Sequence, residues 1–185
     1  MAFLVTDSAF PLPFDTLPAL KLTEFCGRPR RGPVYAYLRC YVQAGSLHFS
    51  ATVFDGAPPA TSRMGLAITA DPGAGRYLFA QVGRGTDCRL TLYENDAPLR
   101  QLACPPVRHL AGQDEQGEYW SAESRLEAGV FRACFGRAPA PGMVLPGNVY
   151  LFDPTEAAYG AAFPGPAGGP VPAAEGFGAF VVVPY

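Results

Sequence analysis

The sequence predicts an all-β fold, an antiparallel β-sandwich with long Gly- and Pro-rich loops. Gly (21 residues) and Pro (20 residues) make up about 22% of the 185 residues, too many for a helical bundle, because both are costly inside helices. Several short segments alternate apolar and polar residues with the period of a strand, and none has the period of an amphipathic helix. Hydrophobic residues make up 49% of the chain, which is enough for a core and excludes intrinsic disorder.

Length and charge narrow the class of protein. A chain of 185 residues has the size of one ordinary domain, and we therefore predict a single domain over residues 1–185. The 14 basic residues nearly balance the 16 acidic ones, and the formal charge of −2 gives no electrostatic footprint for nucleic acid or for an anionic membrane. The sequence does not indicate an oligomeric state.

Residues 1–32 predict an extended, Pro-punctuated segment that leads into the first strand. Residues 34–42 then alternate, with apolar side chains on one face and aromatic or charged ones on the other. A turn at Ala44 and Gly45 leads into a second alternating run, residues 47–53, so the two runs predict a β-hairpin. Its expected core-facing residues are Val34, Ala36, Leu38, Cys40, Val42, Leu47, Phe49, Ala51 and Val53.

The rest of the chain continues as short strands separated by turn residues. The predicted strands are 63–69, 76–82, 88–93, 99–103, 119–126, 148–152 and 177–183. Residues 130–135 are expected to pair with a neighbouring strand, and the acidic stretch 107–118 predicts a solvated loop. Residues 138–176 are rich in Pro and Gly, which predicts a long loop region around the strand 148–152, either a functional loop or a flap.

Signatures of catalysis and of metal binding are absent from the sequence. It contains no nucleophile elbow, zinc-protease motif, phosphate-binding loop or dinucleotide fingerprint, so we expect no cofactor. His48 and His109 are the two histidines, and neither has a motif partner. No run of carboxylates resembles a calcium loop, which leaves Asp55 and Asp71 as solvated turn residues. We therefore expect neither an enzyme nor a metal site.

The N-terminal twenty residues have neither the basic start nor the apolar run of a signal peptide or membrane anchor, so the expected location is the cytoplasm. The 5 cysteines are odd in number and form no C-x-x-C pair, which in a reducing compartment favours free thiols. Cys40, Cys88 and Cys134 lie in apolar, strand-like surroundings and are expected to act as small buried hydrophobic residues.

The polar face of the first strand is the leading candidate for a binding site. Sugars suit such a face, because their C–H faces stack on aromatic rings while their hydroxyls bind planar, bidentate donors. A buried Arg39 would need a carboxylate partner, so this face is expected to be open to solvent or to a concave site. The alternative is that the tyrosines cover one face of a sandwich while Arg39 reaches water. Trp120 presents the same choice between binding and packing. The candidate ligand-binding residues are Tyr35, Tyr37, Arg39, Tyr41, Arg84 and Trp120.

Five segments, spread over most of residues 33–183, share their order with a known family. They are 45–55 (GSLHFSATVFD), 65–71 (GLAITAD), 77–85 (YLFAQVGRG), 120–126 (WSAESRL) and 177–181 (FGAFV). Together they resemble the family 9 carbohydrate-binding modules and the cytosolic family-9-like proteins, relatives of the DOMON sandwich. The resemblance implies a jelly-roll or DOMON-like sandwich without catalytic activity. The family's sugar binders clamp a chain-end sugar between two tryptophans, whereas this chain has one, Trp120.

Three functional hypotheses follow. The leading one is a non-catalytic module that binds a small carbohydrate or a similar polyhydroxyl ligand. The second is a carbohydrate hydrolase whose site lies under residues 138–176 and uses Glu123 or His48. The third is a protein-interaction module without a small ligand, which exposes an apolar patch through the Pro-rich segment.

Overall fold

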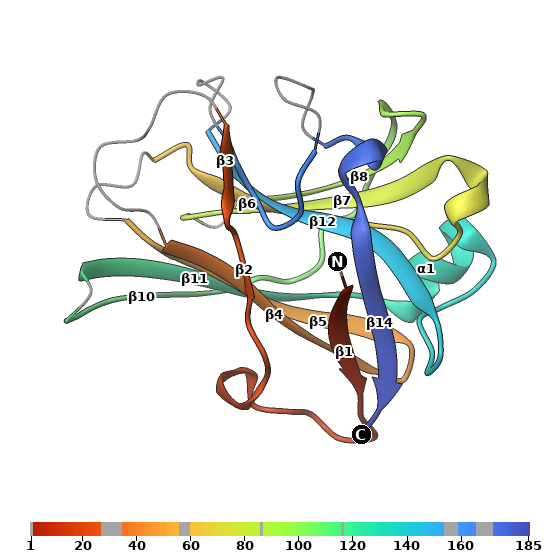
Figure 1. The fold of residues 1–185 in the computed structure, drawn as a ribbon, viewed down its shortest axis with the longest axis horizontal. Coiled ribbons are helices and arrows are strands. Elements are labelled where there is room, and N and C mark those ends of the chain that lie inside the picture. Colours follow the sequence, from red (N-terminus) through yellow and green to blue (C-terminus); the bar gives the residue numbers. More distant parts are fainter. Residues whose placement is uncertain are drawn as a thin grey trace.

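The computed structural model has the all-β fold that the sequence predicts. It describes residues 2–26, 35–55, 60–85, 87–115, 117–153, 159–165 and 172–185. Within these residues, strands β1 to β14 hydrogen-bond into one sheet that curls over into two facing layers, with one short α-helix at the side (Figure 1). A sheet folded over in this way buries apolar side chains between its layers, as a sandwich does.

The first layer consists of four antiparallel strands in the order β10, β11, β5, β4 and is the lower layer in Figure 1. Its strands are β4 (Tyr35–Gln43), β5 (Ser46–Phe54), β10 (Arg108–Asp114) and β11 (Gly117–Leu126). β4 and β5 form the predicted hairpin, and its turn residues Ala44 and Gly45 have φ of 49° and 77°. A tight hairpin turn of this kind matches the twist of the flanking strands.

The second layer lies above the first and continues the same sheet. Its strands are β6 (Arg63–Ile68), β7 (Arg76–Gly83), β8 (Cys88–Glu94), β9 (Ala97–Leu102), β12 (Val144–Phe152) and β14 (Gly178–Pro184). Smaller elements complete the described residues: β2 (Leu20–Lys21), β3 (Glu24–Cys26), β13 (Tyr159–Ala161) and the 3-10 turns η1 (Phe14–Thr16), η2 (Pro72–Ala74) and η3 (Ala174–Gly176).

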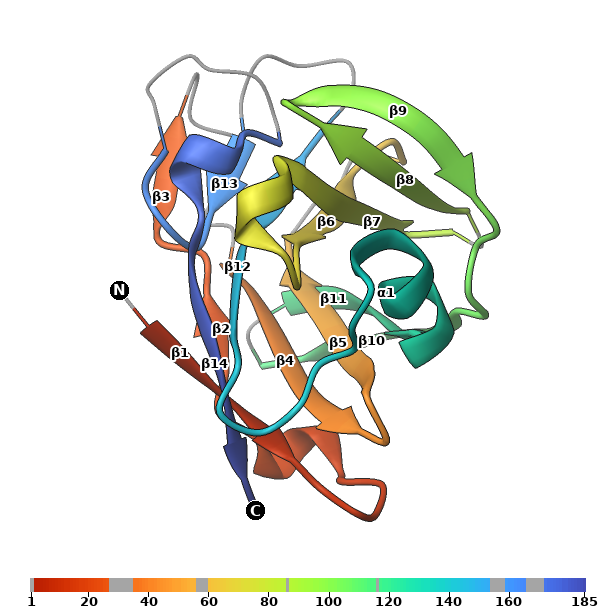
Figure 2. The ribbon, with the colours of Figure 1, turned by 90° about the vertical axis from the view of Figure 1, so that its right-hand side faces the viewer.

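β1 (Ala2–Asp7) joins the two layers (Figure 2). It runs parallel to β14, from the pair Ala2 and Ala179 onward, and its end also pairs in parallel with β4. The N-terminal segment therefore supplies strands to the sheet, and the fold is mixed instead of purely antiparallel. The sequence hides β1 because Leu4, on its exposed side, is as apolar as the buried residues on its other side.

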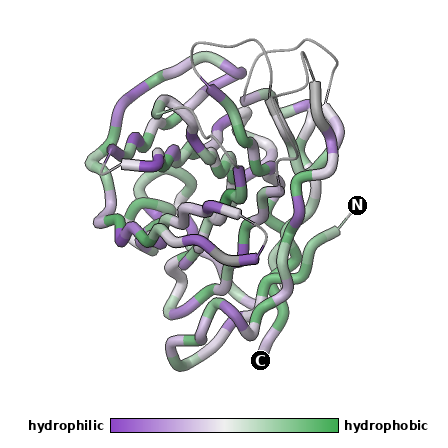
Figure 3. The backbone as a smooth tube through the Cα atoms, turned by 90° about the vertical axis from the view of Figure 1, so that its left-hand side faces the viewer, coloured by the Kyte–Doolittle hydropathy of each residue, from purple (hydrophilic) through white to green (hydrophobic). Residues whose placement is uncertain are grey.

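The predicted core face of the hairpin is confirmed. Leu47, Phe49, Ala51 and Val53 are at most 1% exposed, and the alternate residues of β4 from Ala36 onward are also buried. Val34 lies outside the described residues. In Figure 3 apolar and polar residues alternate along many of the strands, which is the pattern of a sheet with one face in the core.

Two predictions for residues 107–135 are wrong. Residues 108–114 form β10 where a solvated loop was expected, and this strand pairs with β11 alone among the described elements, so polar side chains are tolerated there. Residues 130–135 belong to the helix α1 (Ala128–Phe135) and form no strand. Its buried residues, Ala128, Phe131 and Phe135, recur at spacings of three and four, and Gly136, with φ of 74°, ends it. Only two helical turns carry this pattern, which is too short a stretch to stand out in the sequence.

Residues 138–176 are more regular than expected. They contain β12, β13 and η3, and β12 begins at Val144, four residues before the predicted strand. The extra residues are held by β14, which pairs with Val144 through Gly147. Because β14 is distant from β12 in sequence, the local sequence pattern does not predict this pairing. The described part of the chain holds no helix with the length and hydropathy needed to cross a bilayer.

Candidate functional site

The outer face of the first layer carries the predicted stripe of tyrosines and Arg39. Cross-strand register sets each stripe residue in a row with one residue of β5 and one of β11. Side chains within a row are neighbours, because adjacent strands lie about 4.8 Å apart. The rows are Tyr35, Phe54 and Tyr119; Tyr37, Thr52 and Ser121; Arg39, Ser50 and Glu123; and Tyr41, His48 and Arg125.

One end of this face is an aromatic patch formed by Tyr35, Tyr37, Phe54 and Tyr119. The ring centroids of Tyr35 and Tyr37 lie 5.5 Å apart, and those of Phe54 and Tyr119 lie 5.3 Å apart. Tyr35 is 37% exposed, and the other three are half-buried. The patch therefore presents ring surface to solvent, and the Lys21 ammonium lies 5.7 Å from the centre of the Tyr35 ring.

Arg39 is half-buried in the middle of the face and is held from two sides. Its Nη1 donates a hydrogen bond to the carbonyl oxygen of Phe14 over 3.2 Å, and its guanidinium carbon lies 5.0 Å from the centre of the Tyr37 ring. Its Nε is buried and has no hydrogen-bond partner. Among the described residues no carboxylate forms an ion pair with Arg39. The guanidinium is thus fixed in orientation without being neutralised.

Tyr41 has a different environment from the other tyrosines of the stripe. It is 4% exposed, because its ring stacks on His48 at 4.7 Å and is covered by Phe14 at 5.6 Å. Phe14 belongs to η1, in the connection between β1 and β2, which crosses this end of the face. Tyr41 therefore packs against its neighbours and offers no free ring face.

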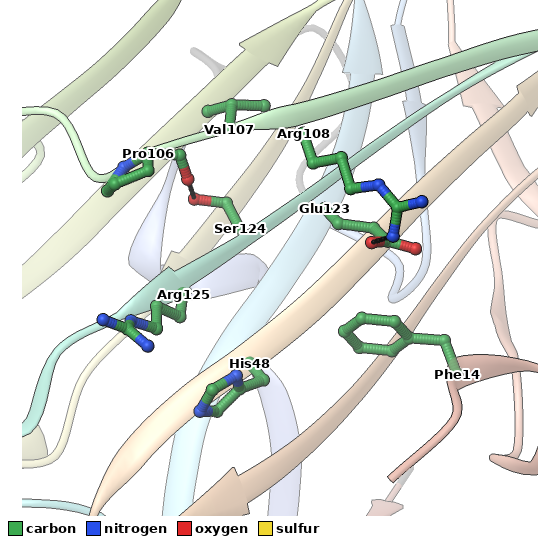
Figure 4. A pocket seen from close by; sticks show the side chains of 8 residues that line it. All are labelled: Phe14, His48, Pro106, Val107, Arg108, Glu123, Ser124 and Arg125. Atoms are coloured by element: carbon green, nitrogen blue, oxygen red, sulfur yellow. Dashed lines mark hydrogen bonds and ion pairs between the residues drawn. The ribbon is translucent and has the colours of Figure 1, made fainter. Parts of the chain in front are cut away.

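A pocket of about 440 Å³ opens beside this covered end (Figure 4). Its lining residues are Phe14, His48, Pro106, Val107, Arg108, Glu123, Ser124 and Arg125. Phe14 reaches in from one side, while Pro106 and Val107 close the opposite side. The hydroxyl of Ser124 donates a hydrogen bond to the carbonyl oxygen of Pro106 over 2.9 Å, which fixes that wall.

Charged groups in the pocket are arranged as pairs. Nη1 of Arg108 lies 3.4 Å from Oε2 of Glu123, across the β10–β11 ladder. Nε of Arg125 lies 2.5 Å from Oε1 of Glu127, which follows β11. The Arg108 and Arg125 side chains are 72% and 53% exposed, so both pairs are open to solvent, and their carboxylates leave the pocket without a strong net charge. Such a site suits a neutral, polar ligand better than an anion.

His48 forms the floor between Tyr41 and Arg125. Burial lowers the pKa of its imidazole below the ordinary value of 6.5, the nearby Arg125 lowers it further, and Glu127 opposes the shift. The imidazole is therefore neutral near pH 7. A neutral imidazole offers one donor and one acceptor, as sugar hydroxyls require.

The structure does not bring Trp120 or Arg84 to this face. Trp120 is 1% exposed and points into the core between the layers. Arg84 lies in the turn after β7 and pairs with Glu118 over 3.8 Å, so it links the two layers at the rim near Tyr119. The position of Trp120 follows from the alternation of β11, whose odd-numbered residues face outward.

The outer face of the second layer is also aromatic, but the chain covers it. Tyr77, Phe79 and Tyr150 form a buried cluster there. Asn148 anchors the covering segment, because its Nδ2 donates to the carbonyl oxygens of Phe163 at 2.9 Å and Gly176 at 2.8 Å. Described parts of residues 138–176 therefore lie over the second layer. The hydrolase hypothesis set Glu123 and His48 under this region, but both lie on the outer face of the first layer.

Sequence reasoning missed several residues of the pocket. Arg108 falls in the predicted loop 107–118, Phe14 falls in the predicted extended segment 1–32, and no motif in the sequence marks Arg125. The register of the predicted hairpin would have paired Phe54 and Thr52 with the first two tyrosines of the stripe. No local signal could have placed Phe14, because its position depends on how η1 crosses the sheet. Among the described residues, no group of three or more His, Cys, Asp or Glu side chains converges on a metal position.

Comparisons with known proteins support the fold. No protein-family model matches the sequence, and no curated protein matches it. A family 9 carbohydrate-binding module from Caldicellulosiruptor kristjanssonii in complex with glucose has a TM-score of 0.66 and 10% identity, covering 100% of this chain and 97% of that one. The same kind of module in complex with cellotriose has a TM-score of 0.67 and 10% identity, covering 100% of this chain and 95% of that one.

A third structure is a proposed carbohydrate-binding protein from Bacteroides uniformis, with a TM-score of 0.74, 11% identity and coverage of 98% of both chains. These likenesses span the whole chain, so the protein has the fold of the family 9 carbohydrate-binding modules. The family-9-like sandwich fold that the sequence resemblance implied is thereby confirmed, while the relation to the DOMON sandwich stays a prediction.

Proposed function

We propose that this protein is a non-catalytic carbohydrate-binding protein, and that a small sugar binds in the pocket on the outer face of the first layer. One observation carries the proposal: an aromatic ring, Phe14, and the ion pair of Arg108 and Glu123 line one open pocket. The fold adds support, because structures with the same fold hold glucose and cellotriose.

The lining groups match the chemistry of a sugar. A sugar ring has apolar C–H faces, which pack on an aromatic ring, and hydroxyls that each donate and accept hydrogen bonds. Arg108 supplies donors, Glu123 supplies acceptors, and the neutral His48 supplies one of each. Charge-assisted hydrogen bonds of this kind are stronger than neutral ones.

The size of the site also fits. Small-molecule pockets usually measure about 300–1,000 Å³, and this pocket of about 440 Å³ lies at the lower end. Arg39 lies two strands away from Glu123 in the same row, a separation of about 10 Å by strand spacing. A longer sugar would extend from the pocket toward Arg39 and the aromatic patch.

The absence of a second carboxylate favours binding over hydrolysis. Glycoside hydrolysis usually needs two carboxyl groups about 5–9.5 Å apart, one on each side of the scissile bond. Among the described residues that line the pocket, Glu123 is the one carboxylate.

Isothermal titration calorimetry tests the proposal, with glucose and cellotriose as first probes and a panel of mono- and oligosaccharides after them. We expect binding at up to millimolar concentration and at least a tenfold loss of affinity for Glu123→Gln and Arg108→Ala. Arg76→Ala is the matched control, because it removes an exposed Arg–Glu pair, with Glu94, on the second layer. The sugar affinity of Arg76→Ala should equal that of the unmodified protein.

Two results would overturn the proposal. One is no binding to any sugar of the panel at millimolar concentration. The other is binding that Glu123→Gln and Arg108→Ala leave unchanged, which would move the site away from this pocket.

A further inference from the structure

Cys88, the first residue of β8, and Cys104, two residues after the end of β9, lie beside each other at the open end of the β8–β9 hairpin. The register of this hairpin pairs Leu90 with Leu102. Continued by two residues toward the open end of the hairpin, the same register sets Cys88 opposite Cys104. The irregularity in this ladder begins at Leu92, on the other side of the Leu90 pair, and does not shift the two cysteines.

A direct contact supports this register. The thiol of Cys104 donates a hydrogen bond to the carbonyl oxygen of Cys88, with 2.8 Å between sulfur and oxygen. Both thiols are free, Cys104 is exposed, and Cys88 is half-buried against the core. One sulfur is therefore open to an oxidant from solution, and the other lies beside it.

We propose that Cys88 and Cys104 form a reversible cross-strand disulfide. Directly opposed residues of an antiparallel pair have Cβ atoms about 4.5–5.5 Å apart, and a disulfide needs about 3.5–4.5 Å, so the strands must approach only slightly. β9 pairs with β8 alone among the described strands, and the edge can make this movement without breaking another ladder.

The reaction needs a small-molecule disulfide, such as oxidised glutathione, as the oxidant. The thiolate of Cys104 attacks one sulfur of the oxidant, which breaks its S–S bond, forms a mixed disulfide and releases one small thiolate. Cys88 then loses its proton to solvent, attacks the sulfur of Cys104 and releases the second small thiolate. Two protein thiols are oxidised, and one small disulfide is reduced to two thiols.

The environments of the two sulfurs fix this order. Burial, followed by the neighbouring thiol of Cys104, raises the pKa of Cys88 to about 12, so Cys88 is protonated at neutral pH. The exposed sulfur of Cys104 therefore reacts first. Cys88 then resolves the mixed disulfide, because its attack on the neighbouring Cys104 sulfur takes place within one molecule.

The test equilibrates the full chain in glutathione buffers from reducing to oxidising, quenches with acid and alkylates the remaining thiols. At the oxidising end we expect a mass loss of about 2 Da, because two hydrogens leave when the bond forms. The number of alkylated thiols should fall by two from the 5 cysteines of the chain. Trypsin should then yield one linked pair of peptides, 85–89 and 101–108, which separates on reduction.

Matched variants identify the pair. Cys104→Ser, at an exposed position, and Cys88→Ser should each abolish the mass loss, while Cys134→Ser, at another half-buried thiol, should keep it. The peptide map of the unmodified protein decides the question even if Cys88→Ser does not fold. The proposal is overturned if every thiol stays reactive at the oxidising end, if Cys104 retains glutathione while Cys88 stays free, or if either sulfur links to a different cysteine.

Discussion

The two outer faces of this sandwich carry similar residues and have opposite environments. On the second layer Tyr77 is 1% exposed, because the chain returns over it, and its hydroxyl donates to Asp96 at 3.0 Å. On the first layer Tyr35 is 37% exposed, and η1 covers only the other end of the face, at Tyr41. The covered face has become a second small core, and part of the other face stays open to solvent.

The comparison shows that an aromatic stripe on a strand does not by itself mark a binding surface. What decides is whether another part of the chain covers it. On the second layer, described residues of the Gly- and Pro-rich region cover the aromatic rings. The side chain of Asn148 holds them in place through hydrogen bonds to Phe163 and Gly176. On the first layer the rings of the aromatic patch stay partly exposed to solvent. Arg39 and the Arg108–Glu123 pair lie on the same face of the sheet.

Truncating one ring on each face gives the largest expected difference. Phe79, at 1% exposed, packs against Tyr93, Tyr150 and Phe152, so Phe79→Ala should destabilise the protein by about 3–5 kcal/mol. Phe54→Ala, in the half-buried aromatic patch, should cost about 1 kcal/mol. Urea unfolding followed by fluorescence measures both. Equal losses would show that the two faces are equally packed.

Removing the anchor of the cover should have the next largest effect. Asn148→Ala leaves buried backbone groups of Phe163 and Gly176 without partners and should cost about 2–3 kcal/mol. It should also speed proteolytic cleavage between residues 159 and 177 while leaving sugar binding intact. Ser121→Ala, which removes hydroxyl contacts on the open face, is the control and should cost about 1 kcal/mol. An unchanged cleavage rate in Asn148→Ala would contradict the anchoring role.

A change on the open face should affect binding more than stability. We expect Arg39→Ala to weaken sugar binding at least tenfold in calorimetry for a ligand that spans the pocket and the aromatic patch, while the free energy of unfolding changes by less than about 1 kcal/mol. Arg39→Lys keeps the charge but loses the planar fork of donors, so its affinity should also fall. A lowered melting temperature with unaltered affinity would assign Arg39 to packing.

The smallest expected effect is a pH dependence from His48. Its pKa is lower in the folded protein than the ordinary 6.5, chiefly because of burial, so the fold favours the neutral imidazole. This contribution to stability is complete above pH 6.5 and is lost as the pH falls through the lowered pKa. Urea unfolding midpoints are measured at several pH values above and below pH 6.5. As the pH falls, the midpoint should decline more steeply for the unmodified protein than for His48→Gln. Parallel curves would exclude a role for His48.

The fold class and the β4–β5 hairpin were predictable because one face of each strand is strictly apolar and the other is not. Leu47 and Phe49 face the core for this reason. β10 was not predictable, because a strand that pairs on one side can keep polar residues on both faces. The helix α1 escaped notice because its pattern rests on three residues over two turns.

The site was predictable in part. Alternation alone puts Tyr37 and Arg39 on one outer face, and pairing of the hairpin adds Phe54. Glu123 and Arg108 join them only through the β11–β5 ladder, whose partners are about seventy residues apart, and nothing local specifies that register. The position of Phe14 depends on the path of a connection with no regular structure beyond one 3-10 turn.

The parallel pairing of β1 with β14 has a consequence for how the protein folds. Ala2 and Ala179 are neighbours in space and nearly the full chain apart in sequence. Contacts of such high sequence separation form late, because the entropy of closing the loop must be overcome before they contribute. The two layers can each begin as local hairpins, but the seam between them closes only when the last strand is available. We therefore expect slow folding for a chain of this size, with β1 among the last segments to gain protection from hydrogen exchange.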